Sequence, residues 1–220
     1  MKGILCLSGG KDSVYAGYLA LQMGMEIERA LVFLPEITDS FMFHCPNIGL
    51  AKMVAECMGL DCKRIQVSGD ETVAIEKAFS EVDEEYIVTG AIASEYQKER
   101  FERCAYKTGK KCLSPLWRKK EIQLLHEIIA AGMKVIFVGY FAEGFSEEIL
   151  GKFLDPQTMA KLETLHSKFG INPSGEGGEY ETLVLDAPFF CKRIELAGAR
   201  KKAGINSGIL EIIDAKIVAK

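Results

Sequence analysis

The segment 1–140 alternates between continuous apolar runs and stretches whose apolar residues recur every three or four positions. The apolar runs, bounded by Gly or Pro, predict buried strands, and the helical spacing predicts amphipathic helices. The predicted strands are 3–7, 29–34, 62–67, 86–89 and 135–138, and the predicted helices between them are 14–23, 48–58, 71–79, 94–106 and 118–132. This alternation is typical of an α/β fold with a parallel sheet covered on both faces.

The pattern changes after residue 142. Asp155-Pro156 predicts the start of a helix over 157–169, because Pro is favoured at the first helical position. Strand-like segments follow at 183–185, 194–196 and 208–218. We therefore expect an α/β domain over residues 1–142 and a smaller C-terminal α+β domain over residues 143–220.

The turn between the first predicted strand and the first predicted helix has the composition of a phosphate site. A helix that starts at such a turn directs backbone N–H groups and the positive end of its dipole at a ligand. Lys11 adds a positive charge there, and Asp12 offers a carboxylate to Mg²⁺. The candidate ATP-binding residues of this loop are Ser8, Gly9, Gly10, Lys11, Asp12 and Ser13. The glycines are adjacent, so this is not a Walker A loop.

In a parallel sheet, ligands bind beyond the carboxyl ends of the strands. Phe33, His44 and Gly90 lie at or after such strand ends, so we expect them to contact ATP as well. Strand-end loops of this kind also include the segment that precedes the predicted helix 94–106.

Composition narrows the class of protein. The formal net charge of −4 gives no global basic field of the kind that favours nucleic-acid binding. No apolar run reaches the ~18 residues that a membrane span needs, and no secretory signal pattern occurs at the start, so we expect a soluble cytoplasmic protein. The seven cysteines form no C-x-x-C pair, which argues against a zinc ribbon and a disulfide framework.

Two charged segments stand out. Nine Lys or Arg residues fall between Lys98 and Lys120, and they could either dock an acidic macromolecule or form solvated helix faces. Three carboxylates, Glu176, Glu179 and Glu181, occur within six residues around Gly177-Gly178. In an extended chain Glu179 and Glu181 point to the same face, and the glycines let Glu176 fold back toward them. We expect these carboxylates to converge and attract a cation.

These motifs together resemble one family. Ser8-Gly9-Gly10-Lys11-Asp12-Ser13 is similar to the pyrophosphate (PP) loop of the ATP pyrophosphatases, which release pyrophosphate and transfer AMP. The order and spacing of the PP loop and four later segments resemble the diphthine–ammonia ligase family within that superfamily. Those segments are Met42-Phe43-His44, Gly90 to Arg100, Ser114 to Trp117 and Gly175 to Thr182.

The resemblance implies a Rossmann-like PP-loop domain and a specific reaction. The carboxylate of diphthine, a modified histidine on elongation factor 2, is adenylated by ATP, and ammonia then displaces AMP. ATP and Mg²⁺, with Asp12 as the metal ligand, would serve the adenylation. The chain offers no room for a glutaminase domain, so we expect free ammonium as the nitrogen donor. A homodimer is left open.

The resemblance also suggests which residues act. The catalytic candidates are Lys11, Asp12, Glu176, Glu179 and Glu181. The substrate-binding candidates are Ser94, Tyr96, Gln97, Arg100, Gly177, Gly178, Tyr180 and Thr182. We expect Lys11 to contact a β- or γ-phosphate and the glutamates to bind or deprotonate ammonium, or to hold the trimethylammonium of diphthine.

Two alternatives remain at this point. A tRNA-modifying ATP pyrophosphatase would adenylate a base and transfer sulfur, using the basic stretch for RNA and Cys104 or Cys112 for sulfur. A nucleotide-sensing protein of the same fold would bind ATP without chemistry. The lack of a C-x-x-C pair disfavours the first, and the combination of Lys11, Asp12 and the glutamates disfavours the second.

Overall fold

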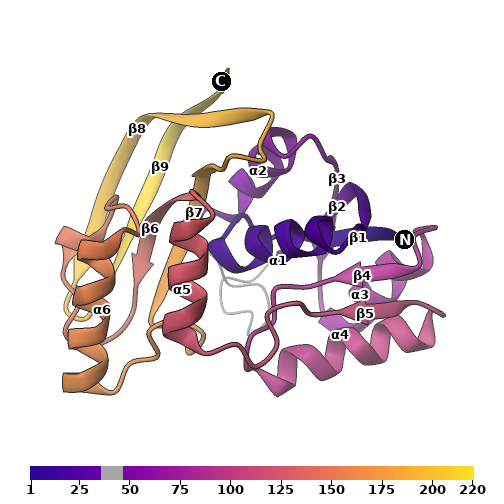
Figure 1. Ribbon diagram of the computed structural model, residues 1–220, viewed down its shortest axis with the longest axis horizontal. Helices are drawn as coiled ribbons and strands as arrows, with labels where there is room; N and C mark the ends of the chain where they lie inside the picture. The colour runs from indigo at the N-terminus through magenta and orange to yellow at the C-terminus, as the bar shows by residue number, and fades with distance from the viewer. Residues whose placement is uncertain (36–46) are drawn as a thin grey trace.

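A five-stranded parallel sheet forms the first part of the chain. The computed structural model describes residues 1–35 and 47–220. The strands stand in the order β3-β2-β1-β4-β5, and all their pairings are parallel (Figure 1). Their bounds are Lys2–Cys6 (β1), Glu26–Pro35 (β2), Asp61–Val67 (β3), Tyr86–Val88 (β4) and Lys111–Leu113 (β5).

Helices cover both faces of this sheet, as its apolar strands predict. Their bounds are Lys11–Gln22 (α1), Ala51–Cys57 (α2), Glu71–Ser80 (α3), Glu95–Lys107 (α4) and Glu121–Ala130 (α5). Ile4 of β1 packs in a cluster with residues of α3 and α4, whereas Leu5 packs in a second cluster with α1 and α2. Successive residues of one strand therefore enter opposite layers.

The second sheet is antiparallel and smaller, with the order β7-β6-β9-β8. Its strands are Lys134–Tyr140 (β6), Tyr180–Asp186 (β7), Lys192–Gly204 (β8) and Ser207–Ala219 (β9), and helix α6 (Pro156–Phe169) follows β6 in the chain. The short helices Ile48–Leu50 (η1) and Glu147–Ile149 (η2) complete the described elements. The expected fold class, a parallel-sheet α/β part with a smaller α+β part, is confirmed.

One strand belongs to a different sheet from the one predicted. The segment 135–138 was expected to continue the parallel sheet, but β6 pairs antiparallel with β7 and β9. Its apolar run correctly indicates a strand buried on both faces, yet burial does not reveal whether the partner strand runs parallel or antiparallel. The prediction of a parallel β6 is therefore wrong, and the change of sheet occurs between β5 and β6.

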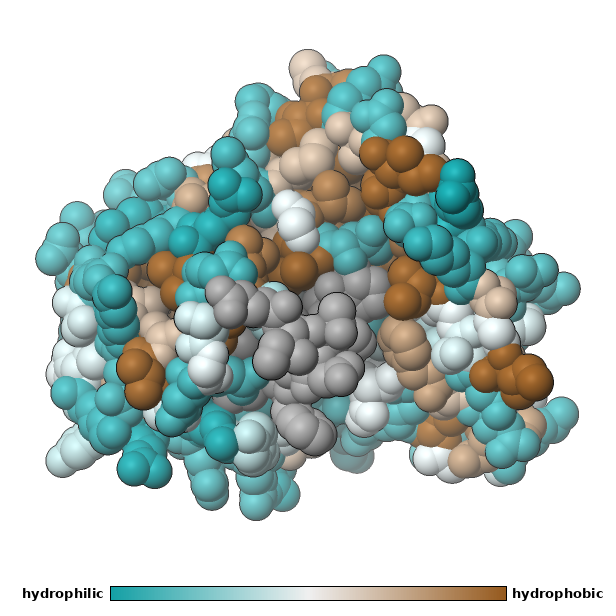
Figure 2. Space-filling view, turned by 180° about the vertical axis from the view of Figure 1, so that it is seen from behind, coloured by the Kyte–Doolittle hydropathy of each residue, from teal (hydrophilic) through white to brown (hydrophobic). Residues whose placement is uncertain are grey.

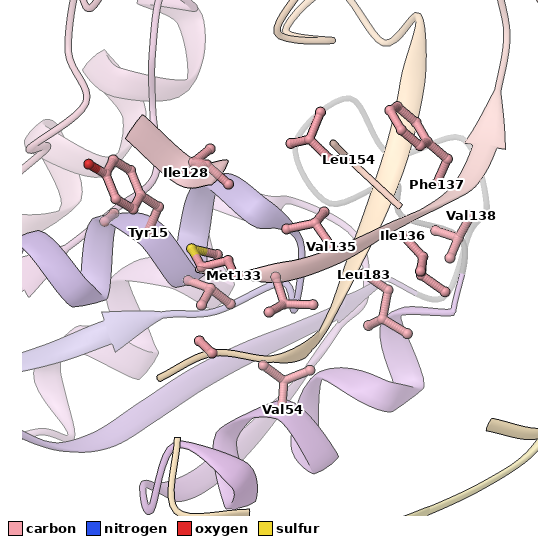
Figure 3. Packing of buried hydrophobic residues seen from close by; sticks show 14 of the residues in the cluster. Tyr15, Val54, Ile128, Met133, Val135, Ile136, Phe137, Val138, Leu154 and Leu183 are labelled. Atoms are coloured by element: carbon pink, nitrogen blue, oxygen red, sulfur yellow. The ribbon is translucent and has the colours of Figure 1, made fainter. Parts of the chain in front are cut away.

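The two sheets share one core. Tyr15 of α1, Val54 of α2, Ile128 of α5, Val135 of β6 and Leu183 of β7 belong to a single buried cluster, and Figure 3 shows these side chains grouped between the elements. Because this cluster crosses from one sheet to the other, sheet membership alone does not define separate domains. The domain boundary at residue 142 stays a prediction.

Local signals account for several element ends. Ser94 caps α4, where its Oγ accepts a hydrogen bond from the Gln97 N–H. Asp155 and Thr158 form a capping box around Pro156 at the start of α6. The strand β5 was not predicted, because Lys111-Cys112-Leu113 begins with a charged residue and forms no continuous apolar run, unlike β4.

Candidate active site

The PP loop links the buried strand β1 to helix α1. Ser8 N–H donates to Ser13 Oγ at 3.2 Å, and Ser13 Oγ donates to the Gly10 carbonyl at 3.1 Å. Gly9 adopts a φ of +83°, a conformation that glycine reaches without steric cost. The two serine hydroxyls thus fix the turn that opens the helix.

Strand β7 of the second sheet binds directly to this loop. The Val184 N–H donates to the Gly9 carbonyl at 3.0 Å, and the Lys11 N–H donates to Thr182 Oγ1 at 3.1 Å. Gly10 N–H is also engaged, with Ser8 Oγ at 3.3 Å. Two of the amides that the sequence suggested as free therefore hold the loop in place rather than point at a ligand.

The Lys11 side chain lies buried, with 3% of its surface exposed. Its Nζ donates to the Ser174 carbonyl at 2.5 Å and to Asp12 Oδ2 at 2.9 Å, and it lies 5.0 Å from the centre of the Tyr180 ring. Burial alone would lower the pKa of Lys11, but the charge of Asp12 and its hydrogen bond outweigh burial, and the pKa is raised. Lys11 is therefore a permanent cation at neutral pH, between the PP loop and the segment around Ser174.

One carboxylate oxygen of Asp12 has no hydrogen-bond partner among the described residues. Its Oδ2 accepts from Lys11, whereas Oδ1 is buried and has no hydrogen-bond partner among the described residues. A buried carboxylate oxygen without a partner is costly unless a cation completes it. This oxygen fits the hard-cation ligand that the sequence assigned to Asp12.

A cavity of about 540 Å³ lies between the PP loop and the 175–182 segment. Most of the candidate site residues line it: Ser8, Gly10, Lys11, Asp12, Ser13, Phe33, Gly90, Ser94, Gln97, Glu176, Gly177, Gly178, Tyr180, Glu181 and Thr182. The structure thus brings the PP loop and residues 176–182, more than 160 residues apart in the chain, to one cavity.

Other candidates lie away from the cavity wall. Gly9 supports the loop from behind, beside Val54 and Leu183. Tyr96 is 48% exposed, and the Arg100 guanidinium stacks on its ring at 3.6 Å on the outside of α4. His44 lies outside the described residues.

The three glutamates have different surroundings, so the predicted convergence is not observed. Glu176 Oε1 accepts hydrogen bonds from the N–H groups at the start of α4. Glu179 precedes β7 and folds back under its own loop, where Oε1 accepts from the Asn172 N–H at 2.7 Å. Glu181 lines the cavity, and its charge contributes to the raised pKa of Lys11. Glu179 lies just before β7 and is not among the residues that line the cavity.

Sequence reasoning missed several residues of the site. Ala91, Phe101 and Phe141 also line the cavity, and Ser174 contacts Lys11 through its carbonyl. Phe101 carried a signal, since it follows Gln97 by one helical turn on the same face of α4. A backbone carbonyl such as that of Ser174 carries none, because any residue type could supply it.

Cys104 and Cys112, the candidates for sulfur transfer, do not have the lowered thiol pKa of a reactive cysteine. Burial raises the pKa of Cys104 to about 11 and that of Cys112 to about 11. The Cys104 thiol donates to the Thr72 carbonyl at 3.8 Å. Both thiols stay protonated at neutral pH, which disfavours a nucleophilic or persulfide-carrying role.

The basic stretch 98–120 is largely neutralised by ion pairs. Examples are Lys107 with Glu76 at 2.5 Å, Lys111 with Glu85 at 2.6 Å and Arg118 with Glu95 at 2.7 Å. Figure 2 shows mostly hydrophilic residues on the flank that carries the parallel sheet. These pairs favour the interpretation of solvated helix faces over that of a nucleic-acid surface.

Comparisons with known proteins give family matches over both parts of the chain. Residues 1–112 match the family profile of the diphthamide synthase N-terminal domain, and residues 120–218 match that of the C-terminal domain. A diphthine–ammonia ligase of Schizosaccharomyces pombe is 36% identical over 89% of this chain, which spans only 36% of that protein's length. A diphthine–ammonia ligase of Danio rerio is 31% identical over 88% of this chain and 86% of its own length.

Among solved structures, the chain is similar to one titled a predicted subunit of tRNA methyltransferase from Methanocaldococcus jannaschii. The identity is 15%, the match covers 85% of this chain and 97% of that chain, and the TM-score is 0.48. Within the described residues, no helix is long and apolar enough to cross a membrane.

Proposed function

Because the chain belongs to the diphthamide synthase family, we propose that it forms the amide of diphthamide on elongation factor 2. The substrates are ATP, ammonia and the diphthine carboxylate. The observation that carries this proposal is the shared cavity, whose walls come from the PP loop on one side and the 175–182 segment on the other.

The first step is adenylation. A diphthine carboxylate oxygen forms a bond to the α-phosphorus of ATP, the bond to the β-phosphate bridging oxygen breaks, and pyrophosphate leaves. The N-terminus of α1 and the fixed charge of Lys11 face the site where negative charge develops on the leaving group. Binding of pyrophosphate by this loop therefore lowers the barrier more than it stabilises bound ATP.

A magnesium ion is part of the proposal. Asp12 Oδ1, buried and without a hydrogen-bond partner in the described chain, would hold it. When bound, the ion neutralises charge on the phosphates. Within the described residues, no group of three or more His, Cys, Asp or Glu could hold a metal, so Asp12 is the one protein ligand that this proposal assigns.

The second step is amidation. Ammonia attacks the acyl carbon, the bond from that carbon to the AMP oxygen breaks, and the nitrogen loses a proton. Glu181 is the cavity-lining carboxylate of β7, and we assign it the role of accepting the proton that this nitrogen loses. A fixed carboxylate beside the cavity also attracts ammonium over neutral solutes.

Mass spectrometry of the modified histidine tests the proposal. Elongation factor 2 carrying diphthine is incubated with the protein, ATP and ammonium, and the histidine-containing peptide is compared with reactions lacking one component. We expect conversion of acid to amide only in the complete reaction, with AMP rather than ADP released. An unchanged acid in the complete reaction, with an intact folded enzyme, contradicts the proposal.

A further inference from the structure

Glu176 makes a contact that its position in an acidic loop does not predict. Its Oε1 accepts hydrogen bonds from three consecutive backbone amides, those of Ile92 at 3.3 Å, Ala93 at 2.9 Å and Ser94 at 3.0 Å. These amides precede the first turn of α4, where a carboxylate is favoured by the helix dipole. The bond joins segments that are 82 to 84 residues apart in the chain.

The segment that receives Glu176 is fixed on its other side. The Arg118 N–H donates to the Ile92 carbonyl at 2.8 Å, and the Thr89 and Ser114 hydroxyls lie 2.9 Å apart. The 89–94 segment is therefore anchored to the turn after β5. The Glu176 side chain, which binds this segment from the cavity side, is therefore held in a fixed position.

Both segments joined by Glu176 form cavity walls. Ala91 and Ser94 line the cavity from the β4 side, while Glu176 and Gly177 line it from the side of the second sheet. The contact thus sets the width of the cavity between the two sides. A second link to the same segment is the hydrogen bond from Lys11 Nζ to the Ser174 carbonyl.

The same geometry removes Glu176 Oε1 from ammonium binding. A carboxylate oxygen has two lone pairs, and three N–H donors already share this one. From these contacts we propose that Glu176 is a positioning residue, which clamps the 175–182 segment to the start of α4 and so sets the acceptor side of the cavity. The kinetic effect expected from this clamp rests on the proposed amidation. The clamp itself rests only on the contacts of Glu176.

Substitutions of Glu176 can distinguish a positioning role from a role as a base or as a negative charge. Glutamine keeps an oxygen of the same reach that accepts N–H groups, whereas aspartate keeps the charge but is shorter by one methylene. We expect the order Glu176→Gln, then Glu176→Asp, then Glu176→Ala in declining activity. Loss of a charge-assisted contact predicts a rise of about 10- to 100-fold in the KM for the diphthine acceptor in Glu176→Ala, and about threefold in Glu176→Gln. The KM for ATP stays within about twofold, since the Ser8 and Ser13 contacts and the Val184–Gly9 pairing hold the PP loop and lie outside the clamped segment.

Amide hydrogen exchange gives a readout that does not require turnover. The peptide containing residues 92–94 is expected to exchange at the wild-type rate in Glu176→Gln and faster in Glu176→Ala. Glu163→Gln and Glu163→Ala are the matched controls, because Glu163 is exposed on α6, and they should change neither the exchange nor the kinetics.

The outcomes are distinct. The inference is overturned if Glu176→Gln loses activity as completely as Glu176→Ala while its 92–94 amides stay protected, or if Glu176→Asp outperforms Glu176→Gln. It is also overturned if Glu176→Ala leaves the exchange of these amides unchanged. If Glu176→Ala does not fold, the Gln and Asp variants carry the comparison. A wild-type protein that forms no amide contradicts the proposed function alone, because the exchange measurements still report the clamp.

Discussion

Lys11 shows how a single buried charge can serve two parts of a site. Its ammonium is held by the Ser174 carbonyl and by Asp12, with the Tyr180 ring below. A protonated lysine in this position is stable because Asp12 compensates its burial. The contact with a β- or γ-phosphate stays a prediction: the ammonium has three N–H donors, and two of them bind Ser174 and Asp12.

We expect Lys11→Met to lower kcat/KM for ATP by about 10- to 100-fold, the value of one hydrogen bond to a charged group. Methionine keeps the approximate length of the side chain and removes the charge. Pyrophosphate exchange into ATP, measured in the presence of the acceptor, follows the adenylation step. Lys168→Met on α6 is the control, because Lys168 is exposed and is not among the residues that line the cavity. A Lys11→Met protein with the wild-type kcat/KM for ATP would limit Lys11 to its contact with Ser174.

At the scale of elements, the packing of the β4–α4 segment against the PP loop depends on a missing side chain. A Cβ atom at Gly90 would lie 2.8 Å from the Ser13 nitrogen and 2.9 Å from the Asp12 carbonyl carbon. Both are backbone atoms, which cannot turn away as a flexible side chain can. Gly90 is therefore required for close approach rather than for a special backbone conformation.

Gly90→Ala should separate these two elements. We expect a loss of about 1–3 kcal/mol in the free energy of unfolding, together with a higher KM for ATP. Denaturant titration and steady-state kinetics measure the two effects. Gly198→Ala in β8 is the matched control, since the nearest atom to its Cβ would be 3.8 Å away. A Gly90→Ala protein equal to the wild type in both measurements would show that the segment shifts without cost.

The elements also show what sequence can and cannot predict. The strand–glycine–helix order around residues 8–13 was predicted correctly because each signal is local: an apolar run, two glycines and a helical period. The partner of β6 was predicted wrongly, since the choice between parallel and antiparallel pairing depends on the rest of the chain. Glu176 and Glu179 accept hydrogen bonds from the backbone amides of Ala93 and Asn172. Because almost any residue type supplies a backbone amide, these contacts could not be predicted from the sequence.

The whole molecule is tied together by its core as well as by its site. One buried cluster includes residues of α1, α2, α5, β6 and β7. Opening this shared cluster would expose apolar surface of both parts at once, which couples their unfolding. We therefore expect the two family segments, 1–112 and 120–218, to behave as one folding unit.

Two probes can test this cooperativity. Trp117 is the only tryptophan of the chain and follows β5, so its fluorescence reports the parallel-sheet part. Far-ultraviolet circular dichroism reports both sheets. We expect the two denaturation curves to coincide in midpoint and slope. Separate midpoints would instead support independent domains, with the boundary to be located by limited proteolysis.

Two hydrogen bonds join the PP loop to β7: Val184 N–H donates to the Gly9 carbonyl, and Lys11 N–H donates to Thr182 Oγ1. This pairing has a consequence for recombination between relatives. A chimaera that joins the first segment of one homologue to the second segment of another must reproduce a strand register, not merely a compatible surface. A slip of one residue along β7 would turn Thr182 to the opposite face and leave the Lys11 amide without its acceptor. The PP loop and strand β7 are therefore expected to be inherited, exchanged and redesigned as a pair.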